Sequence, residues 1–163
     1  MSRQLLELEA VLQQLVVEHG KLLKHVETQQ AAMKAFDTVV MDDVLNLQEA
    51  CRMRITGLEG KRRLLTQQLA KAMRIEGEPK LPKLAELYPA RAVSLLKLRA
   101  QLKDVMTEIA RRTTIASRVA GAVSGHLNTV VRLLAGAVER AGLYTNQGVP
   151  KVSARIGMME AVG

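Results

Sequence analysis

The first 36 residues place apolar side chains at two positions that recur every seven residues. Such a repeat lines one stripe of an α-helix, and the stripe must be covered by other helices. His19 and Gln29 are the two polar interruptions. Together with Ser2 as a helix N-cap, the spacing predicts a helix over about residues 2–37. The two sets are Leu5, Leu12, His19, Val26 and Met33, and Leu8, Leu15, Leu22, Gln29 and Phe36.

A second long helix is predicted over about residues 42–74. Asp42 or Asp43 can cap its N-terminus, where an acidic side chain suits the helix dipole. The Pro-rich connection 75–89 follows, with one helical turn expected to begin at Pro82. Its leucines 81, 84 and 87 can pack against the bundle. The apolar row of the second helix is Val44, Leu47, Cys51, Ile55, Leu58, Leu65 and Leu69.

A third long helix is predicted over about residues 90–141, with Gly142 as its C-terminal stop. Residues 143–163 show no sustained periodicity and are expected to form a mobile basic tail. We therefore expect an all-α fold: three long helices in an antiparallel, partly coiled-coil bundle over residues 1–142, with a flexible C-terminal tail. The heptad sets of the third helix are Leu95, Leu102, Ile109, Ala116, Val123, Val130 and Ala137, and Leu98, Val105, Arg112, Val119, His126, Leu133 and Arg140.

Aromatic residues make up only 2% of the 163 residues, so the core must be aliphatic. A single cysteine, Cys51, excludes a disulfide framework and argues against a thiolate metal site. It favours a reducing, cytoplasmic location. The first residues, MSRQLLELEA, carry charges every few positions and do not resemble a signal peptide.

The formal net charge of +8 is unevenly placed. Residues 1–76 hold 11 Lys/Arg and 10 Asp/Glu, whereas residues 77–163 hold 13 and 6. The second half could therefore attract an acidic partner. Its basic residues lie on several helix faces beside Asp104 and Glu108, and no aromatic platform for base stacking is present. The pattern favours a solvated basic surface over nucleic-acid binding.

No nucleophile elbow, phosphate-binding loop or zinc-protease pair occurs in the sequence. The three histidines at positions 19, 25 and 126 have no metal-ligand spacing. No convergent set of titratable groups points to a reaction. We therefore expect a protein that is not an enzyme and that uses no cofactor and no metal.

From Thr113 to Val138 the only formal charges are Arg118 and Arg132. A central arginine costs about 2.5–3.5 kcal/mol on membrane insertion, so the segment is not expected to span a bilayer. Instead its apolar arc is wider than one bundle-facing stripe. Either the first two helices and a dimer mate cover it, or it forms a groove for an amphipathic helix from another protein. The second apolar row is Ala120, Leu127, Val131, Leu134 and Val138.

Tyr144 stands just after the third helix in the stretch AGLYTNQGVPKV. Two interpretations are open. Its ring could pack onto the helix end as a hydrophobic cap, or it could be offered to a partner as an anchor, since tyrosine is enriched at binding hot spots. Lys151 and Arg155 in the following tail suit an acidic docking surface.

Three stretches, LVVEHGKLLKHV, GLEGKRRLLTQQLA and LYTNQG, follow one another in a layout that resembles the FlgN-type flagellar export chaperones across nearly the whole chain. The resemblance implies a cytoplasmic chaperone that covers the C-terminal amphipathic helix of hook-associated (hook–filament junction) proteins. It would deliver them to the export gate or export ATPase complex, docking only transiently near the membrane. The implied client-binding face is Val119, Val123, Leu127, Val131, Leu134 and Val138. Tyr144 and Gly148 match the position that docks on the gate.

Two departures from the family pattern concern the details of these contacts. Family members often carry paired asparagines at the start of the client-binding half, whereas SRVAGAVSGHL has none before Asn128. Many also have glycine directly after the tyrosine, where this chain has Thr145. The alternatives are a coiled-coil scaffold or stalk subunit of a secretion apparatus and, less favoured, a basic nucleic-acid-binding protein. A homodimer is left open.

Overall fold

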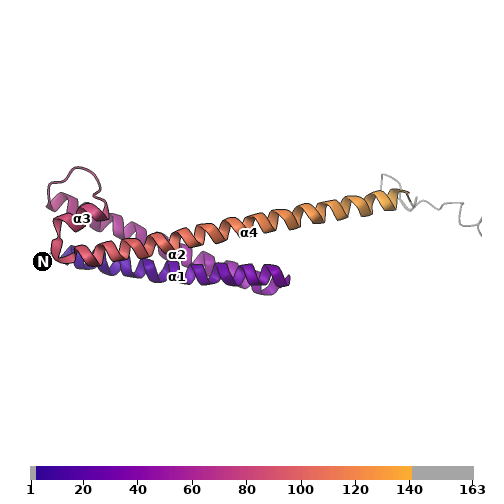
Figure 1. Ribbon diagram of the computed structural model, residues 1–163, viewed down its shortest axis with the longest axis horizontal. Coiled ribbons are helices and arrows are strands. Elements are labelled where there is room, and N and C mark those ends of the chain that lie inside the picture. Colours follow the sequence, from indigo (N-terminus) through magenta and orange to yellow (C-terminus); the bar gives the residue numbers. More distant parts are fainter. Residues whose placement is uncertain (1–2, 141–163) are drawn as a thin grey trace, which may run out of the picture. The chain divides into compact units, whose positions relative to one another are not determined.

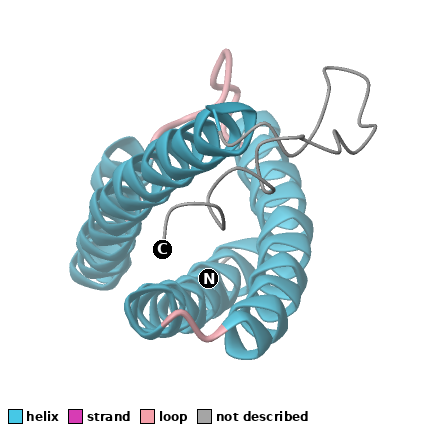
Figure 2. Cartoon of the chain, turned by 90° about the vertical axis from the view of Figure 1, so that its right-hand side faces the viewer, coloured by secondary structure: helices cyan, strands magenta, loops and turns pink. Residues whose placement is uncertain are grey.

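The computed structural model describes residues 3–140, and within that range all regular structure is helical (Figures 1 and 2). The α-helices are α1 (Arg3–Ala35), α2 (Thr38–Ala72), α3 (Leu81–Leu87) and α4 (Ala92–Arg140), with a 3-10 turn, η1 (Pro89–Arg91), before α4. The predicted all-α class is confirmed. Three of the helices are long, and α3 is an additional short helix in the Pro-rich connection.

The chain divides into two compact units, Met1–Ala116 and Ser117–Gly163, and the division falls inside α4. The first unit holds α1, α2, α3, η1 and the start of α4. The described part of the second unit is the remainder of α4. The sequence predicts a single boundary, after residue 142, which lies outside the described residues, and it predicts none within the third long helix.

A two-residue link reverses the chain between α1 and α2, which lie side by side (Figure 1). Phe36 adopts φ +54°, the left-handed conformation that usually ends a helix at glycine. Its N–H donates to Met33 and that of Asp37 donates to Ala32, so two terminal carbonyls of α1 are satisfied. Phe36 itself is 73% exposed. The heptad assignment placed it in the buried stripe; this is wrong, because the helix ends one residue earlier.

Asp37 is also the N-cap of α2. Its carboxylate accepts a 3.0 Å hydrogen bond from the Val40 N–H. The expected caps, Asp42 and Asp43, lie inside the helix instead, and α2 begins at Thr38 rather than near residue 42. The reason is that the left-handed Phe36 completes the reversal within two residues. Asp37, the second residue of the link, is therefore already in place to cap the new helix.

The core of the first unit is aliphatic and is formed by all four helices. From α1, Leu8, Leu12 and Leu15 are completely shielded from solvent. Because the chain supplies so few rings, leucine carries most of the buried volume. The cluster comprises Leu5, Leu8, Val11, Leu12, Leu15, Leu65, Leu69, Leu84, Ala85, Leu95 and Leu98.

Polar residues also occupy inward positions, among them Gln48 and His19. Gln48 of α2 is 2% exposed, and its amide donates a 2.9 Å hydrogen bond to the side-chain oxygen of Gln29 on α1. Leu47, expected in the apolar row of α2, is 49% exposed because the buried row passes through Gln48 instead. His19 is buried, and its Nδ1 lies 2.7 Å from the carbonyl oxygen of Leu15, so that nitrogen carries the proton.

The connection between α2 and α4 is held to the core by α3. The left-handed Arg74, at φ +57°, ends α2, with hydrogen bonds from Arg74 N–H to Lys71 and from Ile75 N–H to Ala70. Pro82 lies in the first turn of α3, as the sequence suggested, and Leu84 is fully buried in the core. At the end of η1, Arg91 forms a 3.4 Å ion pair with the buried carboxylate of Glu9 on α1.

Candidate partner-binding surface

The residues proposed from sequence to bind a client lie on α4 within the second unit. The candidate client face is the set Val119, Val123, Leu127, Val131, Leu134 and Val138. Of its members, the first five are exposed, from 37% at Val123 to 62% at Val131. Val138 belongs to α4, but its side chain lies outside the described residues. Five large aliphatic side chains exposed on one helix form the kind of patch that usually marks an interaction site.

Spacing along the helix aligns these residues on one side. Leu127 and Val131 are four apart, as are Val119 and Val123, so they follow one another on successive turns. Val130 and Leu133, assigned to heptad positions, are exposed beside the candidate client face. The exposed apolar arc is therefore wider than the six residues and includes members of both apolar rows described from the sequence.

The opposite side of the same segment is polar. Arg118, Thr129 and Arg132 fall there by helical spacing, and the Thr129 hydroxyl donates a 3.0 Å hydrogen bond to the carbonyl oxygen of Gly125. Added Cβ atoms at Gly121 and Gly125 would meet nothing within 4 Å, so the helix backbone is open to approach at these positions. The segment is thus an amphipathic helix with a broad apolar side.

Burial along α4 changes with position. Leu95 and Leu98 are buried, and Leu102, Val105 and Ile109 are half-buried. From residue 117 to 137 every residue except Gly136 is exposed. The heptad pattern alone does not show this change, because the pattern continues without interruption through both units.

The part of α4 that carries the candidate client face contains no acidic residue before Glu139. Between Glu108 and Glu139 the sequence has no Asp or Glu, while Arg111, Arg112, Arg118 and Arg132 are present. The segment would therefore attract a ligand with carboxylates and repel a basic one.

The perturbed titratable groups belong to the first unit and act between or along its helices. Hydrogen bonds from Lys21 at 2.7 Å and from Arg54 at 2.8 Å lower the pKa of the Glu18 carboxyl. On α4, hydrogen bonds from Arg111 and Arg112 lower the pKa of Glu108 to about 2. These groups form ion pairs within or between helices. In the part of the chain that the structure describes, no cluster of His, Cys, Asp and Glu could hold a metal ion.

Tyr144 and Gly148, the residues expected to dock on the export gate, lie outside the described residues. Within residues 3–140, no helix combines the length and apolar character needed to cross a membrane.

Comparison with known proteins gives one match. No curated protein and no solved structure matches the chain. The family described as FlgN protein matches residues 1–151, which is nearly all of the 163. The match spans both units and continues past the last described helix, and on this evidence the chain belongs to the FlgN family of flagellar export chaperones.

Proposed function

We propose that this chaperone holds the C-terminal amphipathic helix of a hook–filament junction protein on the candidate client face of α4. The observation that carries the proposal is the exposure of Val119, Val123, Leu127, Val131 and Leu134 on one helix of a FlgN family member. A free junction protein would expose an apolar helix face that invites premature assembly. Covering that face with an equally apolar helix removes both surfaces from water.

The expected affinity suits a delivery protein. A client helix that buries about 600 Å² of apolar surface would gain on the order of 15 kcal/mol before costs. Much of this gain is offset by the loss of translational freedom and by the ordering of side chains. Binding would be tight enough to protect the client and weak enough to release it.

We further propose that the complex forms in the cytoplasm and docks transiently at the export gate or export ATPase complex, near the membrane. Tyr144 would supply a rigid ring and one hydroxyl to the docking contact, together with Gly148 four residues later in the sequence. Tyr144 lies after the last residue of the candidate client face in the sequence, and we propose that it serves docking while the face holds the client.

The direct test is co-purification from a flagellated bacterium. The tagged chain is recovered from cell extract, and the bound proteins are identified by mass. Recovery of a junction protein, and loss of that protein when its C-terminal helix is deleted, is the expected result. Recovery of the junction protein after deletion of the helix would contradict the proposed mode of binding.

A homodimer that covers the same apolar arc is the main competing arrangement. Light scattering during size-exclusion chromatography separates the two. We expect the molar mass of the species in solution to rise when the client peptide binds and to stay the same in Leu127→Asp. A dimer that this substitution converts to monomers would mean that the client face is already occupied by a second copy.

A further inference from the structure

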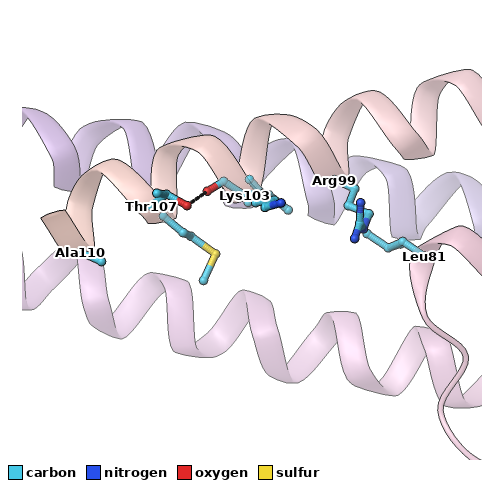
Figure 3. Close-up of a pocket in the computed structure, with 7 residues that line it drawn as sticks. Leu81, Arg99, Lys103, Thr107 and Ala110 are labelled. Atoms are coloured by element: carbon cyan, nitrogen blue, oxygen red, sulfur yellow. Dashed lines mark hydrogen bonds between the residues drawn. The ribbon is translucent and has the colours of Figure 1, made fainter.

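An apolar groove lies in the first unit, along the early part of α4 (Figure 3). Its volume is about 490 Å³. Arg99, Lys103, Thr107 and Ala110 line it from α4, and Leu81 from α3 lies at the end opposite to Ala110. The α3–α4 groove is lined by Leu81, Arg99, Leu102, Lys103, Met106, Thr107 and Ala110.

The floor of the groove is an apolar strip. Leu102, Met106 and Ala110 are spaced four residues apart and therefore follow one another on successive turns. Leu102 packs against the core of the unit, whereas Met106 is 52% exposed. The Thr107 hydroxyl donates a 2.7 Å hydrogen bond to the carbonyl oxygen of Lys103, so its polar group is already used within the helix (Figure 3). An unbranched methionine can adapt to a partner's shape.

Two exposed cations line the same strip. Arg99 and Lys103 are exposed, and neither forms an ion pair within the described range of the chain. By contrast, Arg91 pairs with Glu9, and Arg112 pairs with Glu27 and Glu108. Lys97 is exposed as well, but it lies on the other side of α4 by helical spacing. Two positive charges beside an apolar strip are therefore left for an external partner.

An apolar strip with positive charges along it is complementary to an amphipathic helix that carries carboxylates beside its apolar face. The span from Arg99 to Ala110 covers about 16 Å along the helix axis, enough for about three turns of a docked helix. We propose that the α3–α4 groove docks an acidic amphipathic helix of a partner protein. This site is separate in sequence from the candidate client face, so it does not depend on the proposed function.

Other occupants fit the charges less well. Residues 143–163 of the chain contain Lys151 and Arg155 against a single Glu160, so this segment is itself basic. A nucleic acid would leave the apolar floor without a partner, because the lining includes no aromatic side chain on which a base could stack.

The test uses a fluorescent synthetic helix with leucines on one face and glutamates beside them, and a twin in which lysines replace the glutamates. Each is titrated against the full chain by anisotropy. The acidic peptide is expected to bind and the basic twin is not. Lys103→Glu should weaken binding of the acidic peptide by about fivefold, because it replaces an attraction with a repulsion. Met106→Glu should weaken it by about tenfold, because it places a charge in the apolar contact.

Lys97→Glu is the matched control, since Lys97 is exposed and lies on the opposite side of α4 by helical spacing. It introduces the same change in net charge and should leave binding nearly unchanged. Equal weakening by Lys97→Glu and Lys103→Glu would show general charge attraction and overturn the proposal. Binding that Leu127→Asp weakens and the groove variants do not would place the peptide on the candidate client face, which also overturns it.

A second measurement locates the peptide directly. In protein labelled with [¹³C-methyl]methionine, the Met106 methyl resonance is assigned by its absence in Met106→Leu. It is expected to shift as the acidic peptide is added. Binding without any shift of this resonance would also contradict the proposal. A negative result for the α3–α4 groove does not affect the client proposal, because the client proposal is tested with the junction-protein helix and with Leu127→Asp.

Discussion

The side-chain amide of Gln30 on α1 donates a 2.9 Å hydrogen bond to the main-chain carbonyl oxygen of Arg112 on α4. The guanidinium of Arg112 in turn lies 3.2 Å from the Glu27 carboxylate and 3.3 Å from the Gln30 side-chain oxygen. Both the backbone and the side chain of Arg112 are thus tied to α1. These contacts lie four residues before the end of the first unit at Ala116.

Arg112→Ala should loosen the attachment of α4 to α1. We expect the free energy of unfolding to fall by about 1–2 kcal/mol, because the substitution removes the guanidinium contacts to the Gln30 side-chain oxygen and the Glu27 carboxylate on α1 and one of the two arginines on Glu108. Amide hydrogen exchange in α4 near this residue should accelerate. Arg111→Ala is the control, because Arg111 pairs with Glu108 on the same helix. Equal losses of stability in both variants would mean that the contacts to α1 contribute nothing.

Glu108 makes the stability of the fold sensitive to acid. Hydrogen bonds from Arg111 and Arg112 lower its pKa from 4.5 to about 2, so the ionised form is favoured in the folded state. A depressed pKa contributes stability that is complete above the ordinary pKa and is lost as the pH falls through the lower value. The contribution should therefore disappear between pH 4.5 and about 2.

Glu108→Gln should reduce this acid sensitivity, measured as the change in urea midpoint as the pH is lowered from about 5 to about 2. Arg111→Gln should reduce it in part, because Arg111 is the largest cause of the shift. An unchanged slope in Glu108→Gln would assign the acid sensitivity to other carboxyls, among them Glu18, whose pKa is also lowered.

Leu127→Asp should weaken the client contact without unfolding the protein. The side chain is 60% exposed, so its replacement removes little buried surface from the free chain. A charge in the centre of an apolar contact should weaken binding of a junction-protein helix by about tenfold or more. Calorimetric titration with the C-terminal helix of the client measures this, and far-UV circular dichroism checks the helicity.

Thr129→Asp is the matched control for that substitution, since it introduces the same group two residues away on the polar side of α4. It should bind the client helix normally. A collapse of helicity in Leu127→Asp would show instead that this row is part of the folded core.

Tyr144→Ala should separate client binding from export. If the ring is an anchor for the export machinery, the variant should bind the client helix as the parent chain does and secrete less junction protein in a complemented deletion strain. Tyr144→Phe, which keeps the ring, should restore part of the secretion. Normal secretion by Tyr144→Ala would remove the tyrosine from the docking contact.

Phe36→Gly should stabilise the α1–α2 hairpin. A non-glycine residue in the left-handed conformation costs about 1–2 kcal/mol, and Phe36 is too exposed to recover that cost by packing. Glycine also raises the conformational entropy of the unfolded chain, which offsets part of this gain. A net increase of about 0.5–1 kcal/mol in the free energy of unfolding is expected. Thermal unfolding measures it. Ala31→Gly, one turn earlier in α1, should lose about 1 kcal/mol, and a loss in both variants would show that Phe36 makes a stabilising contact.

Much of the helical architecture follows from local pattern. The seven-residue spacing of Leu8, Leu15 and Leu22 indicates a helix and also which side of it is buried. The turn at Pro82 follows from the fixed φ of proline. The caps could not be assigned with the same security, because Asp37, Asp42 and Asp43 are all acceptable N-caps by type. Only the left-handed conformation at Phe36 decides among them.

The α3–α4 groove shows a different limit. Leu102, Met106 and Ala110 have helical spacing in the sequence, yet Leu102 had already been assigned to the heptad stripe. Whether the neighbouring residues are covered depends on how α3 and α4 pack, since Leu81 at the end of the groove lies 18 residues before Arg99. Local spacing contains no information on that contact.

By itself, the sequence determined the helical class, the aliphatic nature of the core, the family layout and the broad apolar side of α4. All of these depend on residue type and on the regular 3.6-residue turn of a helix, which neighbouring residues share. Tertiary structure decided which apolar rows are buried and where Arg112 is held by α1. It also decided that Gln48, and not Leu47, is buried in α2, where it forms a hydrogen bond with Gln29. Burial and hydrogen bonding depend on which distant segments meet, and the period of a helix is the same whether its apolar side is covered or exposed.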